Sequence, residues 1–187
     1  MKINLTLSTA VTLFITTLLM TACNGKTDNT KGEETDSIVA LVPDTALYGT
    51  VGEGTTMHVL ELKTDGGKTL SLEMDTEEES SVLGGVFAGD RVTLTFTEND
   101  KGEKFITRMV NQTSLMGKWT SLDRNFKIQE DGAVESAGTA ETHPYTQWSM
   151  SNAQLILNAD TFDVVSLGPD SMSLENNEGI FVYKRQK

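Results

Sequence analysis

Short runs of alternating apolar and polar residues, separated by glycine-containing turns, constrain this chain more than any other feature. In Met57–Lys63 and Thr69–Met74, apolar side chains recur two residues apart. This spacing places them on one face of a β-strand, whereas an amphipathic helix requires a spacing of three to four. The turn Asp65-Gly66-Gly67 between the runs is typical of a hairpin, because glycine adopts the positive φ of tight turns. The sequence therefore predicts an all-β fold.

Five such runs predict a first domain over residues 45–113. The expected strands are Ala46–Val51, Met57–Lys63, Thr69–Met74, Arg91–Thr97 and Lys104–Asn111. The acidic segment Asp75–Leu83, after the third strand, is predicted to be a short helix, because carboxylates stabilise a helix N-terminus. Three strands, a helix and two strands follow the order of an OB-fold. We therefore expect an OB-like five-stranded barrel.

Eight shorter runs predict a second domain over residues 114–187. The expected strands are Gly117–Leu122, Asn125–Gln129, Val134–Ala137, Gln147–Met150, Gln154–Asn158, Phe162–Leu167, Ser171–Leu174 and Ile180–Lys184. Turn signals such as Gly168-Pro169-Asp170 separate them. Eight short strands joined by hairpins predict an up-and-down β-barrel.

The N-terminal residues predict export and an anchor rather than a fold. Lys2 precedes an apolar run that is too short to span a membrane, which is typical of a signal peptide over residues 1–22. The sequence LLMTAC, ending at Cys23, resembles the bacterial lipobox. That resemblance implies acylation of Cys23 and attachment to a membrane of the cell envelope. By the same analogy, Asn24 favours the outer membrane. The polar residues 23–44 are predicted to be a flexible, lipidated tether.

The second domain carries a family resemblance in LMGKWTS (Leu115–Ser121), FKIQEDGAV, YTQWSM, AQLIL and the terminal FVYKR. These segments resemble the small lipocalin-like domains of Bacteroidetes lipoproteins. The triplet from Gly117 to Trp119 matches the lipocalin Gly-x-Trp motif. The resemblance implies that Trp119 closes one end of the barrel beneath a basic residue from the last strand, either Arg185 or Lys184. It also implies a binding fold, although this barrel is shorter than a typical lipocalin.

Several classes of function are disfavoured by the composition. The net charge of −12 opposes nucleic-acid binding, which needs a positive surface. The two histidines, His58 and His143, fall in different predicted barrels, so we expect no metal site. His58 is expected in the core or at its rim, and His143 in a loop. No Gly-x-Ser-x-Gly elbow is present, and Glu77–Glu79 is expected to be a solvated helix start. We therefore expect no enzyme and no cofactor.

Two functions remain open at this point. An eight-stranded barrel is just wide enough to be filled by side chains or to hold one small ligand. If Trp148 points inward, a small apolar or amphipathic ligand would be bound at the cell envelope by Trp148, Leu155, Leu157 and Phe162. Filled barrels would instead indicate an interaction module for an envelope protein or glycan.

Overall fold

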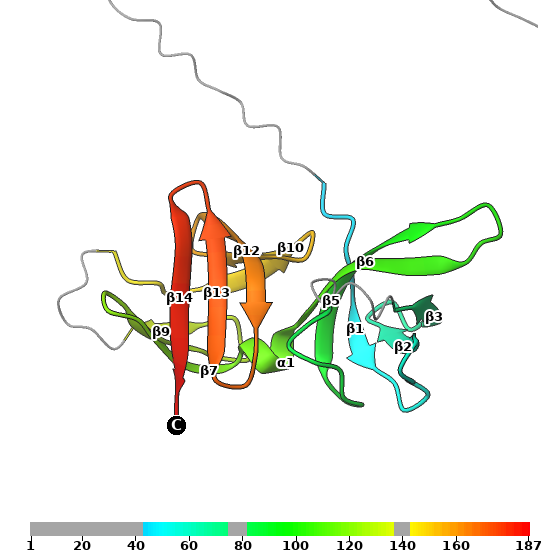
Figure 1. Ribbon diagram of the computed structural model, residues 1–187, viewed down its shortest axis with the longest axis horizontal. Helices are drawn as coiled ribbons and strands as arrows, with labels where there is room; N and C mark the ends of the chain where they lie inside the picture. Colours follow the sequence, from blue (N-terminus) through cyan, green and yellow to red (C-terminus); the bar gives the residue numbers. More distant parts are fainter. Residues whose placement is uncertain (1–42, 75–81, 137–142) are drawn as a thin grey trace, which may run out of the picture. The chain divides into compact units, whose positions relative to one another are not determined.

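The computed structural model describes residues 43–74, 82–136 and 143–187 (Figure 1). The predicted signal peptide, Cys23 and most of the predicted tether lie outside these ranges. The described residues form two β-sheets and the four-residue helix α1 (Gln112–Leu115), which confirms the predicted all-β class. Within the described ranges, no helix has the length and apolar character needed to cross a membrane.

The first sheet has six strands. They are β1 (Leu47–Val51), β2 (Val59–Thr64), β3 (Thr69–Glu73), β4 (Val82–Leu83), β5 (Arg91–Glu98) and β6 (Lys104–Asn111). Their order is β3-β2-β1-β5-β6-β4, and β3 also pairs with β6 in parallel at Glu73 and Phe105. All five strands predicted here are present, close to their expected bounds. The OB-like identity of this sheet stays a prediction.

The predicted helix over Asp75–Leu83 is wrong at its C-terminal end. Val82 and Leu83 form β4, which pairs in parallel with Met109 and Val110 of β6. Hydrogen bonds to the open edge of β6 outweigh local helix preference here, and the β-branched Val82 favours a strand. Residues 75–81 lie outside the described part of the chain.

The first sheet buries the apolar face that the alternation predicts. Leu60 and Leu62 of β2 are fully buried, as are Val92 and Leu94 of β5. Together with Leu72 of β3 they belong to one hydrophobic cluster. Burial of a leucine or valine side chain contributes about 1.5–3 kcal/mol, so this cluster is the main source of stability for the sheet.

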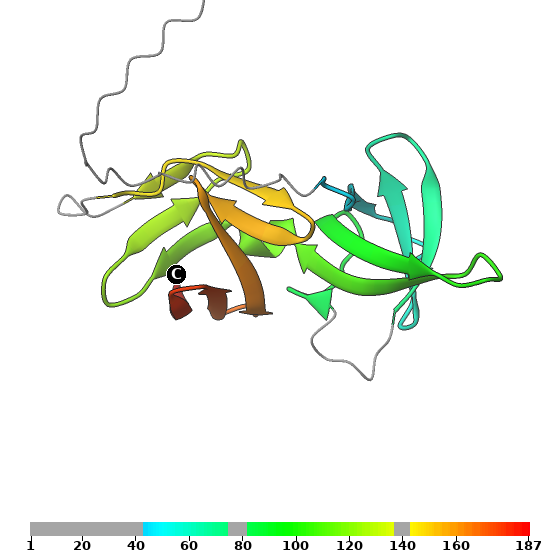
Figure 2. The same ribbon diagram turned by 90° about the horizontal axis from the view of Figure 1, so that it is seen from above.

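The second sheet has eight strands. They are β7 (Gly117–Thr120), β8 (Asn125–Ile128), β9 (Val134–Ser136), β10 (Trp148–Ser151), β11 (Gln154–Leu157), β12 (Asp160–Leu167), β13 (Ser171–Asn176) and β14 (Gly179–Gln186). Their order is β10-β11-β12-β13-β14-β7-β8-β9, and a bridge between Ala133 and Gln147 joins the two ends. Strands β7 to β14, coloured from yellow-green to red, curve around a shared interior (Figure 1, Figure 2). The predicted eight-stranded, up-and-down barrel is confirmed.

A buried asparagine at the end of β6 fixes the connection from the first sheet to α1. Asn111 is fully buried, and its side-chain oxygen accepts a hydrogen bond from the Ser114 backbone N–H at 3.0 Å, which caps α1. Its amide nitrogen donates to the carbonyl oxygens of Gly84 and Gly85 and to Asp90. The asparagine therefore holds three segments of the chain around the start of α1.

Both sheets belong to one compact unit and share polar contacts. The Arg108 guanidinium, on β6, donates to the Val164 carbonyl oxygen on β12 at 2.6 Å. The Tyr48 hydroxyl of β1 donates to Asp44 and also to the Met150 carbonyl oxygen at 2.9 Å. Asp44, at the end of the predicted tether, accepts the backbone N–H of Asn152 at 3.0 Å. These bonds tie the start of the first sheet to the β10–β11 hairpin.

Candidate ligand-binding site in the eight-stranded barrel

Trp119 on β7 closes one end of the barrel interior. Its side chain is 1% exposed, and its indole nitrogen donates to the Leu115 carbonyl oxygen at 2.8 Å. Trp119 and Arg185 lie opposite each other on β7 and β14. The Arg185 guanidinium carbon lies 4.2 Å from the centre of the tryptophan ring, in the geometry of a cation–π contact. Of the two basic residues considered for this position, Lys184 is exposed.

Arg185 is held by the chain on its polar side as well. Its Nη1 and Nη2 atoms donate to the carbonyl oxygens of Met116 and Ser114, each at 2.5 Å, and its Nε donates to Pro169 at 2.7 Å. Burial lowers the pKa of Arg185, and the charge of Asp170 opposes that shift. An arginine remains protonated in proteins, so these three bonds stay charge-assisted.

Gly117 makes room for this arginine. Its φ is +124°, which lies in the region that favours glycine, and a Cβ atom there would lie 2.6 Å from the Arg185 Nη1 atom. The Gly-x-Trp motif therefore has a physical basis in this barrel. The glycine gives the space for Arg185, and Trp119 gives the ring on which Arg185 stacks.

An aromatic layer lies next to Trp119, because Phe126 pairs with Trp119 across β7 and β8. Phe126 contacts Tyr145 and Tyr183 edge-to-face, with ring centres 5.5 and 5.1 Å apart. Phe162 contacts Tyr145 and Phe181 in the same manner, at 6.4 and 5.9 Å. Edge-to-face pairs contribute about 0.5–1.5 kcal/mol beyond their burial, so the layer is both apolar and specifically arranged.

The four predicted ligand residues face this same interior. Trp148 lies opposite Leu157 on β10 and β11, and Leu155 lies opposite Phe162 on β11 and β12. All four belong to one hydrophobic cluster. The Trp148 indole nitrogen donates to the Gln129 carbonyl oxygen at 2.6 Å. Its side chain is 9% exposed, whereas both leucines are fully buried.

The comparison with protein families agrees with this geometry. A family model described as lipocalin-like matches residues 111–186. Residues 111–186 form a lipocalin-like domain. No curated protein matches the chain significantly, and no solved structure does either. The match covers the eight-stranded barrel together with α1, and it does not extend to the first sheet.

The lipocalin-like domain contains interior residues that sequence reasoning missed. Tyr145 lies in the loop before β10, yet it is 5% exposed and packs between Phe126 and Phe162. The Arg124 guanidinium carbon lies 4.3 Å from the centre of the Tyr145 ring, and Arg124 donates to the His143 carbonyl oxygen at 3.1 Å. The sequence carries no signal for this burial, because Tyr145 precedes β10 and is not part of an alternating apolar and polar run.

Both histidines lie outside the strands. His58 precedes β2 and is exposed, so its expected place in the core is wrong, whereas His143 lies in a loop as predicted. Among the described residues, no group of three or more His, Cys, Asp or Glu side chains has the geometry of a metal site. A cavity of about 830 Å³ on the outside of β11–β13 is lined by polar residues such as Asp163 and Glu175.

Proposed function

We propose that the lipocalin-like domain binds one small apolar or amphipathic ligand and performs no chemistry on it. The observation that carries the proposal is a lipocalin-like family match over a nearly closed barrel whose interior is aromatic and aliphatic. Such an interior favours apolar molecules, because roughly 25 cal/mol is gained per Å² of apolar surface that leaves water.

The ligand would be bound at the end of the barrel that is remote from Trp119. The Trp119 end is occupied by Arg185 and its hydrogen bonds to the α1 region. Further along β14, four residues before Arg185, lies Phe181, which contacts Phe162 and is only partly buried. A ligand there would contact Phe162 and Phe181 and extend toward Trp148 and Leu157, and it would separate side chains that now contact one another.

We further propose that the protein acts at the cell envelope, attached through an acylated Cys23. The support is the signal-like segment before Cys23 and the polar stretch after it. Two or more acyl chains hold a protein stably on a membrane without a transmembrane helix. The outer membrane is the proposed location, and the first sheet is proposed to be an OB-like module that faces proteins or glycans rather than nucleic acid.

One observation favours the alternative, an interaction module whose barrels are filled. Leu155 and Leu157 are fully buried and Phe162 is only 2% exposed, so these side chains are already shielded from water without a ligand. In this case the domain would present its outer surface to an envelope protein or glycan, and its interior would serve only stability.

Substitution of two adjacent residues of β14 distinguishes the two proposed functions. Phe181 packs on the interior cluster, whereas Val182 faces outward and is 58% exposed. We would titrate the protein with a fluorescent single-chain fatty acid and follow energy transfer from tryptophan. The proposal predicts saturable binding that Phe181→Ala weakens by about tenfold, which corresponds to about 1.4 kcal/mol, and that Val182→Ala leaves unchanged. No binding, or equal loss in both variants, would support the filled-barrel alternative.

A further inference from the structure

A cavity with polar and apolar walls, of about 510 Å³, lies beside α1, apart from the barrel interior. Its walls come from β1, from β5 with the loop before it, from α1 with the residue that follows it, and from the turn after β8. They are Thr50, Gly89, Arg91, Gln112, Thr113, Met116 and Glu130. The volume falls within the range of small-molecule sites, which often lie between structural units. None of the four predicted ligand residues of the barrel lines this cavity.

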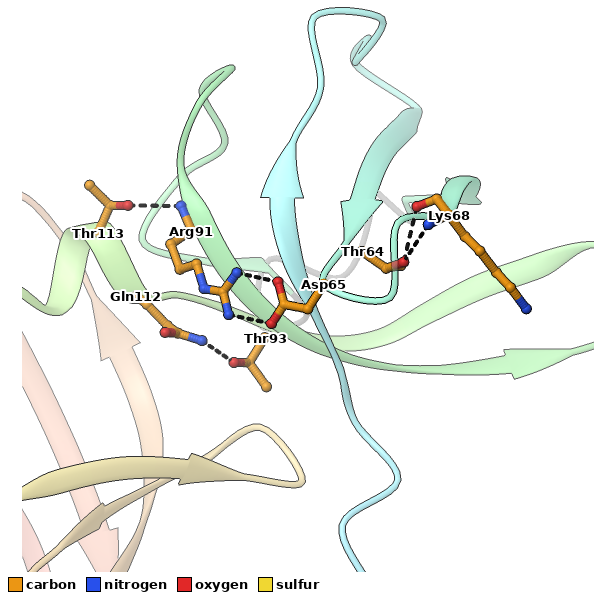
Figure 3. A network of polar contacts seen from close by, with 7 residues as sticks. All are labelled: Thr64, Asp65, Lys68, Arg91, Thr93, Gln112 and Thr113. Atoms are coloured by element: carbon orange, nitrogen blue, oxygen red, sulfur yellow. Dashed lines mark hydrogen bonds and ion pairs between the residues drawn. The ribbon is translucent and has the colours of Figure 1, made fainter. Parts of the chain in front are cut away.

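A buried amide in the wall offers an unused hydrogen-bond acceptor. The Gln112 side chain is 8% exposed, and its amide nitrogen donates to the Thr93 hydroxyl oxygen. Its amide oxygen lies on the side away from Thr93 and has no hydrogen-bond partner among the described residues (Figure 3). An amide oxygen accepts hydrogen bonds, so a donor group on a ligand in the cavity could bond to it.

The positive charge in the wall is already neutralised. Arg91 donates to both carboxylate oxygens of Asp65, each at 2.5 Å, and Figure 3 shows this paired geometry. The backbone N–H of Arg91 donates to the Thr113 hydroxyl oxygen at 2.9 Å, which leaves the hydroxyl hydrogen of Thr113 free to donate. An anionic ligand therefore finds no uncompensated cation among these residues.

The other wall residues favour a neutral ligand that donates hydrogen bonds. Glu130 contributes a carboxylate that forms no ion pair with any described residue. Thr50 contributes a hydroxyl that forms no hydrogen bond with any residue of the described ranges. Glu130 and the Gln112 oxygen accept hydrogen bonds, whereas the two threonines both donate and accept. Half-buried Met116 adds an apolar wall.

From this arrangement we propose a second binding site, for a neutral, hydroxyl-rich molecule such as a sugar unit. Several hydroxyl groups would donate to Gln112 and Glu130 and exchange hydrogen bonds with Thr50 and Thr113, and a C–H face would pack on Met116. This site is separate from the proposed apolar site in the barrel, so either site can fail without the other.

The test uses saturation-transfer NMR of the full chain with two probes, methyl glucoside and the disaccharide of N-acetylglucosamine, each at millimolar concentration. Thr50→Val and Glu130→Gln remove polar groups from the wall and keep the size of the side chain. Thr97→Val and Glu53→Gln make the same changes at exposed positions outside the cavity. Binding of the fluorescent fatty acid is measured in every variant.

The inference predicts binding of at least one sugar, weakened roughly 3- to 10-fold by each wall variant because one hydrogen bond is lost, and unchanged by the two control variants. Fatty-acid binding should not respond to any of the four substitutions. No sugar signal, or a signal that the wall variants do not weaken, would overturn the inference. Preferential binding of an anionic probe such as glutarate would overturn the assigned ligand class.

Discussion

Replacement of Trp119 by alanine tests whether this residue is the structural plug of the lipocalin-like domain. Trp119 is 1% exposed, so the substitution empties a large part of the core. Large-to-small substitutions of buried tryptophan cost about 3–5 kcal/mol, through lost transfer free energy and the remaining cavity. The variant also loses the Trp119–Leu115 hydrogen bond and the contact with Arg185. We therefore expect the upper part of that range.

The chain allows this loss to be measured within one domain. Its two tryptophans, Trp119 and Trp148, both lie in the lipocalin-like domain, so the fluorescence of Trp148 reports unfolding of that domain in the variant. Urea titrations followed by this fluorescence, together with circular dichroism, give the free energy of unfolding. Trp119→Phe serves as the control, because it keeps a ring beneath Arg185 and removes the indole N–H.

The phenylalanine variant should lose about 1–2 kcal/mol, the amount expected for one hydrogen bond and a small cavity. A loss of less than about 1 kcal/mol in Trp119→Ala would refute the assignment of Trp119 as the plug, since it lies well below the range of about 3–5 kcal/mol for a buried tryptophan.

Three further perturbations follow from the same contacts. Gly117→Ala should destabilise the domain by about 1–3 kcal/mol in urea unfolding, because alanine is strained at positive φ and its Cβ would displace Arg185; an unchanged midpoint would contradict this. Hydrogen bonds from Arg91 lower the pKa of Asp65, so this pair stabilises the fold above about pH 4, and the stabilisation is lost as the pH falls further. In Asp65→Asn, the free energy of unfolding should therefore fall less steeply below pH 4 than in the parent protein, by less than about 1 kcal/mol because both groups are half-exposed; an unchanged pH dependence would contradict this. Asn111→Ala should cost about 2–4 kcal/mol in thermal unfolding, because it removes the hydrogen bonds made by a fully buried amide and the cap of α1; a loss within error would show that the cap is dispensable.

Local alternation predicted the strands because each strand buries one face. The runs around Leu60, Leu72 and Leu94 are strands with their apolar residues in the core, as expected. The same logic could have chosen Arg185 over Lys184, because Arg185 shares the inward face of β14 with Phe181 and Tyr183.

Contacts between distant segments could not be predicted in this way. The strand β4 exists because Val82 meets the edge of β6 at Met109, and the local sequence, rich in acidic residues, favours a helix instead. Tyr145 is buried although its neighbours carry turn signals, because the rings of Phe126 and Phe162 surround it. The buried cap Asn111 and the cavity beside Gln112 likewise depend on pairings that no single strand encodes.

The central claim is that the lipocalin-like domain carries a small apolar or amphipathic ligand. The most direct test is mass spectrometry of the protein purified gently from cells that produce it, under native and then denaturing conditions. Any covalent acyl groups, such as those proposed on Cys23, would remain in both spectra, so only a non-covalent ligand produces a difference. The account predicts a reproducible extra mass, the size of one small molecule, that is lost on denaturation. The same bare mass under both conditions would contradict the claim and favour a filled barrel.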